Sequence, residues 1–183
     1  AYTSLGGTTT LSGTDVIAPA VTDLQSGDDT WRGGASGAYK VYFADYGSGL
    51  SKFQARITTA TNAGVTFIAD WTEVVTNSVA QTYTSDWQLP GAAFGGIPEN
   101  TTSYVSVRVY DNSSNVTVST DVFYVKRDIT APAVTNNAVT NTNWTATDPG
   151  PIYDVDFADA LSGLRYIQYS ASSQQGTASG NLL

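Results

Sequence analysis

The chain of 183 residues contains no cysteine, no histidine and no methionine. Without thiol and imidazole groups it cannot form disulfides, and it cannot build the zinc, haem or iron–sulfur sites that use these ligands. The missing methionine leads us to expect that Ala1 is a processed or cut end. No apolar run is long enough to cross a bilayer as a helix, so we expect no direct insertion into a membrane.

Basic residues are also scarce, with 8 lysines and arginines against 16 acidic residues and a net charge of -8. The bases are scattered along the chain, so nucleic acid is not an expected partner. All acids except Glu73 and Glu99 are aspartates, which are favoured in turns and in cation sites built from oxygen ligands. No stretch has sustained helical periodicity.

Catalysis has little support from the residues that are present. Without histidine and cysteine, the remaining options are paired carboxylates, Ser–Lys pairs or a metal held by aspartates. Nothing in the spacing of the acids marks such a pair, and Glu73 and Glu99 fit solvated loop or edge positions. We therefore expect that the protein is not an enzyme.

Alternation of apolar and polar residues is the main pattern in the chain. Between Tyr104 and Tyr110, for example, Val105, Val107 and Val109 should face a core. Segments rich in Gly, Asn and Asp separate the alternating stretches, as expected for turns. The predicted strands are 16–24, 38–45, 50–59, 65–71, 79–89, 104–110 and 116–125. Seven strands without helices predict an all-β fold, and the strand count is that of an immunoglobulin-like β-sandwich.

One block of the sequence occurs twice. Residues 39–50 carry the motif Tyr-x-Val-x-Phe-Ala-Asp and then Ser-Gly-Leu, and both return 114 positions later at 153–164. The motif Asp-x-x-Ala-Pro at Asp15 returns at Asp128. A repeat of this length is typical of tandem β-sandwich domains. We therefore predict a tail at 1–14, a complete domain at 15–127 and an incomplete second copy at 128–183.

These motifs, together with Tyr-Asp-Asn-x-x-Asn-Val at 110–116, resemble those of bacterial immunoglobulin-like modules of large extracellular repeat proteins. The resemblance covers about residues 15–183. It implies an immunoglobulin-like sandwich that lies at the cell surface or is secreted, with neighbouring repeats as partners and a role in stalks, adhesins, surface layers or spacers. The family's usual glycine before the last Asn is Ser114 here, which puts in question a turn with positive φ at this position.

Two kinds of binding site are weighed against structural roles. Oxygen ligands at loop ends could hold calcium and stiffen a domain junction; these residues are Asp45, Asp111, Asn112, Asn115 and Asp128. Alternatively, they cap turns through their own backbone.

Trp71 and Trp87 each follow an aspartate and are the expected exposed candidates for stacking on a glycan. The alternative is that they belong to the core, as the recurring Trp31 and Trp144 suggest.

The second copy has only nineteen residues after Leu164, whereas the first has more than seventy between Leu50 and Asp128. Three strands with open edges would be prone to aggregation. Either the chain belongs to a longer array, or another copy completes the half domain by strand addition, with residues 1–14 as donor. Such a head-to-tail contact generates a filament. We expect a non-catalytic structural building block; an adhesive or carbohydrate-binding module, or a spacer repeat, is the alternative.

Overall fold

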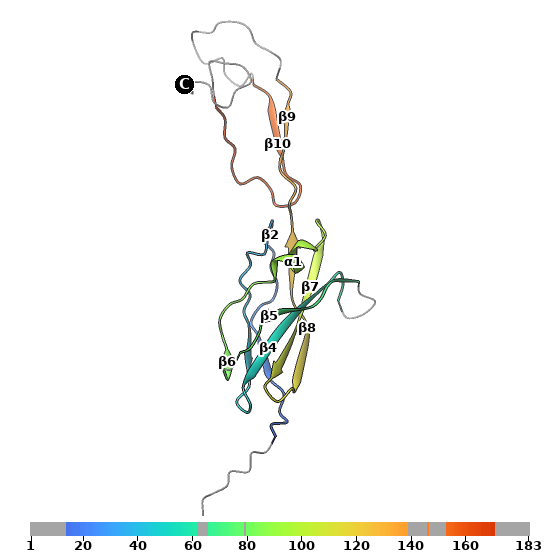
Figure 1. Cartoon of the computed structure of the whole chain (residues 1–183). Helices are drawn as coiled ribbons and strands as arrows, with labels where there is room; N and C mark the ends of the chain where they lie inside the picture. Colours follow the sequence, from blue (N-terminus) through green and yellow to red (C-terminus); the bar gives the residue numbers. More distant parts are fainter. Residues whose placement is uncertain (1–13, 62–65, 79, 139–145, 147–152, 171–183) are drawn as a thin grey trace, which may run out of the picture. The chain divides into compact units, whose positions relative to one another are not determined.

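The computed structural model describes residues 14–61, 66–78, 80–138, 146 and 153–170 (Figure 1). Over these ranges the protein is all-β, as predicted, and its helical part is the five-residue α1 (Gly91–Gly95). The chain divides into two compact units, residues 1–128 and 129–183. Among the described residues, no helix is long and apolar enough to span a bilayer.

Unit 1 contains two β-sheets (Figure 1). The smaller sheet has the order β1-β3-β6, with β1 at Ala20–Asp23, β3 at Val41–Ala44 and β6 at Thr82–Tyr83. The larger sheet has the order β2-β8-β7-β4-β5. Its strands are β2 (Trp31–Arg32), β4 (Leu50–Thr58), β5 (Phe67–Val75), β7 (Thr102–Asp111) and β8 (Val116–Arg127). The pairs β4–β5, β4–β7 and β7–β8 are antiparallel, and the short pair β2–β8 is parallel.

The core of unit 1 is built from alternating residues of both sheets. The predicted valines of β7 are buried, whereas Arg108 between them lies on the other face and is half-buried. Val41 and Phe43 of the smaller sheet belong to the same apolar cluster as these valines. Burial of one such side chain contributes about 1.5–3 kcal/mol, so this cluster is the main source of stability in the unit.

The structure differs from the sequence expectation between residues 79 and 89. Over the described residues 80–89 the strand that forms is β6, which is followed by an isolated bridge between Tyr39 and Trp87 and then by α1. Trp87 was expected to be exposed, and this expectation is wrong, because only 4% of its surface is accessible. Its indole N–H donates to the carbonyl oxygen of Val41 at 2.9 Å, which allows the whole ring to lie in the core.

Unit 2 repeats one strand pair of unit 1 in the same register. Strand β9 (Ala133–Asn136) corresponds to β1, and β10 (Val155–Ala158) corresponds to β3. Both pairs are antiparallel, and the pair Val21 opposite Phe43 returns as Val134 opposite Phe157. The repeated sequence therefore forms the same local structure in both units.

The turn that follows β3 is repeated after β10. The Oδ1 atom of Asp45 accepts the backbone N–H groups of Gly47 and Gly49, at 3.1 and 2.8 Å. In unit 2, Asp159 accepts the corresponding pair of N–H groups at 3.1 and 2.9 Å. Gly49 and its counterpart Gly163 have φ values of 79° and 74°, a conformation that glycine adopts without strain. An aspartate and a glycine four residues apart thus define this turn.

Candidate functional site

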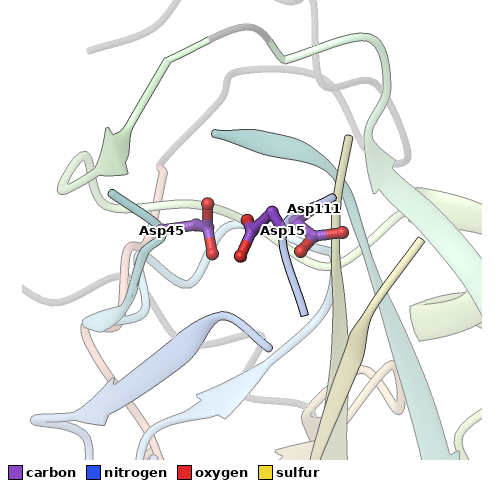
Figure 2. Close-up of side chains that lie close together, drawn as sticks. All are labelled: Asp15, Asp45 and Asp111. Atoms are coloured by element: carbon purple, nitrogen blue, oxygen red, sulfur yellow. The ribbon is translucent and has the colours of Figure 1, made fainter. Parts of the chain in front are cut away.

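Three aspartate side chains converge where three loops of unit 1 meet (Figure 2). One carboxylate oxygen each from Asp15, Asp45 and Asp111 lies within 4.8 Å of the other two. Asp15 precedes β1, Asp45 follows β3 and Asp111 ends β7. The side chains of Asp45 and Asp111 are buried, which is uncommon for aspartates that have no basic partner.

Backbone N–H groups orient these carboxylates. Asp111 Oδ1 accepts from Ser113 at 2.9 Å and from Asn115 at 2.7 Å. Asp15 accepts from Ile17 at 3.0 Å and from Ser48 at 2.7 Å. The hydrogen bonds from Ile17 and Ser48 hold the pKa of the Asp15 carboxyl below its usual value. The turn-capping role that was weighed against metal binding is therefore present at these residues.

The two asparagines of the predicted set join the loops to one another. Asn115 donates through Nδ2 to Asp111 Oδ2 at 2.6 Å and to the carbonyl oxygen of Asp15 at 3.0 Å. Asn112 donates through Nδ2 to the carbonyl oxygens of Ser48 and Gly49 at 3.0 and 3.1 Å. The turn between β7 and β8 is thus tied to the segment before β1 and to the loop after β3.

Ser114 in the same turn has a φ of 72°. The turn therefore has the positive φ that the replacement of glycine put in question. This conformation is unfavourable for a residue with a Cβ atom, but the hydrogen bonds that flank it fix the turn.

The electrostatics of the cluster favour a cation. The ion pairs found among the described residues are Arg32–Asp28, Lys52–Glu73 and Lys126–Asp29, and none of them includes Asp15, Asp45 or Asp111. Carboxylates this close repel one another when all are ionised. Calcium takes six to eight oxygen ligands from carboxylates, carbonyl groups and water, and these three side chains have the chemistry of such a set.

Two features distinguish this cluster from the predicted calcium ligands. Asp128 does not lie with the others. Strand β8 has 12 residues, begins directly after Asn115 and ends directly before Asp128, so about 40 Å of strand separates the two at 3.3 Å per residue. Asp15, which sequence reasoning did not select as a ligand, takes part instead. The repeat carried the signal, since Asp15 is the counterpart of Asp128 in the first copy.

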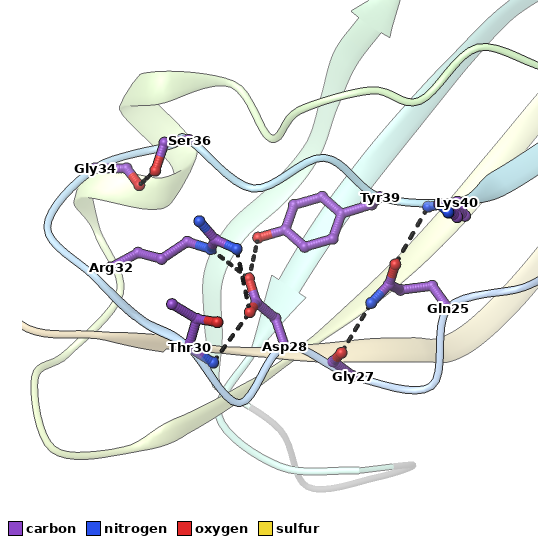
Figure 3. Close-up of polar contacts among 9 residues, drawn as sticks. All are labelled: Gln25, Gly27, Asp28, Thr30, Arg32, Gly34, Ser36, Tyr39 and Lys40. Carbon is purple, nitrogen blue, oxygen red and sulfur yellow. Dashed lines mark hydrogen bonds and ion pairs between the residues drawn. The ribbon is translucent and has the colours of Figure 1, made fainter. Parts of the chain in front are cut away.

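A further buried carboxylate, that of Asp28, has a basic partner (Figure 3). It accepts hydrogen bonds from the guanidinium group of Arg32, from the Thr30 N–H at 3.1 Å and from the Tyr39 hydroxyl at 3.2 Å. Burial raises the pKa of Asp28, but the hydrogen bonds from Arg32 and Thr30 together bring it below its usual value. All its hydrogen bonds hold a loop in place, which indicates a structural role.

The tryptophans have different surroundings. Trp71 is half-buried on the outer face of the larger sheet, where the guanidinium carbons of Arg56 and Arg108 lie 4.6 and 4.5 Å from its ring centroid. Trp31 is also half-buried, with Lys126 Nζ 5.8 Å from its ring centroid. Trp144 lies outside the described residues. Of the two glycan candidates, only Trp71 is accessible.

Unit 2 exposes positions that unit 1 buries. Val41 is 0% exposed, but its counterpart Val155 is 36% exposed. Leu50, at 2%, corresponds to Leu164 at 43%. In unit 1, β4, β6, β7 and β8 complete the core around these positions. The strands formed by the described residues of unit 2 are β9 and β10, and no described strand there corresponds to β6, β7 or β8.

Comparison of the chain with protein-family models, curated proteins and solved structures gave no match.

Proposed function

We propose that this protein is a non-catalytic structural building block of a bacterial-type extracellular surface protein or fibre. In this proposal unit 1 is an immunoglobulin-like β-sandwich, and unit 2 is a partial immunoglobulin-like domain that a strand from another copy completes. The observation that carries the proposal is the repeated strand pair, which has the same register in both units but an exposed apolar face in unit 2.

The energetics of burial support completion by an added strand. Val155, Leu164 and Ile167 are between 36% and 54% exposed, and a strand laid across them would remove this surface from water. Full burial of one such side chain contributes about 1.5–3 kcal/mol, so partial burial of three would contribute a few kcal/mol. Backbone hydrogen bonds along the edge of β10 would add affinity, as in other cases of strand addition.

Residues 1–14 are the proposed donor. The segment has no charged side chain. Leu5 and Leu11 are an even number of positions apart, so an extended strand would present both side chains on the same face. Because the donor precedes the strands of unit 1 and the proposed acceptor is unit 2, each copy would offer both parts of the contact. A heterologous contact of this kind does not close on itself, and it therefore propagates into a filament.

The aspartate cluster is the proposed calcium site of this building block. Asp15 belongs to the segment through which the chain reaches β1, and the other two carboxylates belong to loops of unit 1. A cation bound to all three would fix the direction in which that segment leaves unit 1. It would thereby stiffen the connection to a preceding unit or donor strand.

Negative-stain electron microscopy tests the assembly. We expect filaments from the full chain, and no filaments from a chain without residues 1–14 or from a Leu5→Asp/Leu11→Asp variant. The matched control is Leu24→Asp/Val118→Asp, which adds two charges at residues that are exposed in unit 1. Monodisperse particles from the full chain would overturn the proposal and favour the spacer alternative, in which a following segment of a longer chain completes unit 2.

A further inference from the structure

The outer face of the larger sheet carries a continuous row of alternating cations and aromatic rings. The Arg56 guanidinium carbon lies 5.0 Å from the ring centroid of Phe67 and 4.6 Å from that of Trp71. The Arg108 guanidinium carbon lies 4.5 Å from the Trp71 centroid and 5.4 Å from that of Tyr110. Lys52 Nζ extends the row, 5.1 Å from the Tyr110 centroid. Strands β4, β5 and β7 all contribute to this row, which we call the cation–aromatic face.

This face is locally positive in a chain that is strongly negative. Its three cations have one carboxylate among them, because Lys52 pairs with Glu73 at 2.8 Å and neither arginine has an ion pair with a described residue. Arg108 instead donates two hydrogen bonds to the amide oxygen of Gln54, at 2.8 and 2.6 Å. Three of the chain's eight lysines and arginines therefore lie on this face, whereas the chain as a whole has an excess of acids.

The neighbouring strand continues the face with apolar side chains. Val118 of β8 stands opposite Arg108, and Val116 stands opposite Tyr110. Both valines are exposed to solvent, as is Phe67 at the far side of the row. A partner laid across the sheet would therefore meet aromatic rings that contact guanidinium groups, with exposed aliphatic side chains on the neighbouring strand.

We propose that the cation–aromatic face binds an acidic polysaccharide whose sugar rings carry carboxylate groups. Guanidinium groups pair with carboxylates in a planar, two-hydrogen-bond geometry. Aromatic and aliphatic side chains suit the apolar faces of sugar rings. A nucleic acid fits less well, because its charge density of one phosphate per about 1.7 Å would be repelled by the acidic remainder of the chain. This surface is separate from the strand contact proposed above, so either proposal can fail alone.

The test is affinity electrophoresis of the full chain in gels that contain polygalacturonate, with neutral dextran as the comparison polymer. We expect retardation in polygalacturonate at low salt, loss of retardation at about 0.5 M salt because the Debye length falls to a few ångströms, and none in dextran. An Arg56→Gln/Arg108→Gln variant should bind at least tenfold more weakly. The charge-matched control, Lys40→Gln/Arg165→Gln, removes two exposed cations elsewhere and should bind like the wild type.

A second variant guards against misfolding of the first. Val118→Glu places a carboxylate at an exposed position opposite Arg108, without removing a ring or a cation from the row. It should also lose binding, while its thermal unfolding stays close to that of the wild type. Absence of wild-type binding to polygalacturonate, equal retardation in dextran, or wild-type binding by folded Val118→Glu would each overturn the proposal.

Discussion

Aspartate has three different roles in this chain, and the surroundings of each residue decide which one applies. Asp28 is buried against Arg32 and contributes to an ion pair. Asp159 caps a turn through two backbone N–H groups in unit 2. Asp45 caps the corresponding turn in unit 1 and also faces two further carboxylates. A composition rich in aspartate is therefore compatible with a structural protein and with a cation site in the same domain.

Asp28 gives stability that depends on pH. Its pKa in the folded protein is lowered from an unfolded value of about 3.9, so its contribution is present above about pH 4 and is lost as the pH falls through the folded pKa. We expect Asp28→Asn to lower the free energy of unfolding by about 2 kcal/mol at pH 7, because it leaves Arg32 without its partner. Urea denaturation at pH 7, 5 and 3 should give a difference that shrinks toward pH 3.

Asp23→Asn is the control for this comparison, because Asp23 is exposed and its carboxylate accepts only the nearby Gln25 N–H in the described contacts. This variant should change the stability of the chain by less than about 0.5 kcal/mol at neutral pH. If Asp28→Asn destabilised the protein equally at pH 7 and pH 3, the charge of Asp28 would not be the source of the effect.

Truncation of the buried Trp87 should destabilise the protein much more than truncation of the half-buried Trp71. Trp87→Ala removes a buried ring with its hydrogen bond, and we expect a loss of about 3–5 kcal/mol in the free energy of unfolding. Trp71→Ala removes contacts with two guanidinium groups on a half-buried surface, and about 1–2 kcal/mol should be lost. Chemical denaturation followed by tyrosine fluorescence checks both, and equal losses would contradict the assigned positions.

At the scale of elements, the strands with regular alternation could be predicted and the irregular segment could not. The alternation in β3 and β7 reports directly which side chains face the core, so sequence and structure agree there. The strand predicted at residues 79–89 is wrong because Trp87 is positioned by a bridge to Tyr39, a contact between residues far apart in the sequence. The short β2 was missed, since two residues are too few for any periodicity.

The candidate calcium site shows the same limit. Asp45 and Asp111 could be selected because each begins a turn with the residues that turns require. Their proximity to Asp15 depends on how β1, β3 and β7 are arranged, and no local pattern records that arrangement. Conversely, Asp128 shares its motif with Asp15 but lies beyond the far end of β8. The sequence therefore predicted which residue types could bind a cation, whereas only the fold shows which of these residues lie close together.

Calcium should stabilise unit 1 through the three-carboxylate cluster. Ligand binding to the folded state alone raises stability by about 2.7 kcal/mol at a hundredfold excess over the dissociation constant. We expect calcium to raise the thermal midpoint of the chain by several degrees relative to excess chelator, and Asp111→Asn to abolish this shift. The control is Asp86→Asn, which alters an exposed carboxylate that accepts a hydrogen bond from the Tyr42 hydroxyl, and this variant should keep the calcium-induced shift. No shift in the wild type would leave turn capping as the role of the cluster.

At the scale of the whole molecule, the two units have the same strand pair but different burial. Phe43 of unit 1 contacts Phe53 with ring centroids 4.5 Å apart and is buried in the core. Its counterpart Phe157 occupies the same place in the register but is only half-buried. Since most stability comes from buried apolar surface, unit 1 should dominate the unfolding of the chain, and unit 2 should become stable only when it is completed.

A pair of equivalent substitutions separates these two contributions within the intact chain. Phe43→Ala should lower the free energy of unfolding of unit 1 by about 3–5 kcal/mol, because it leaves a cavity in a packed core. Phe157→Ala should leave that transition unchanged and should instead suppress filaments in the electron microscope, because it removes apolar surface from the proposed acceptor. The measurements are calorimetry of both variants and microscopy of Phe157→Ala beside the wild type. If Phe157→Ala shifted the unfolding of unit 1 while filaments persisted, the second unit would serve the stability of the first rather than assembly.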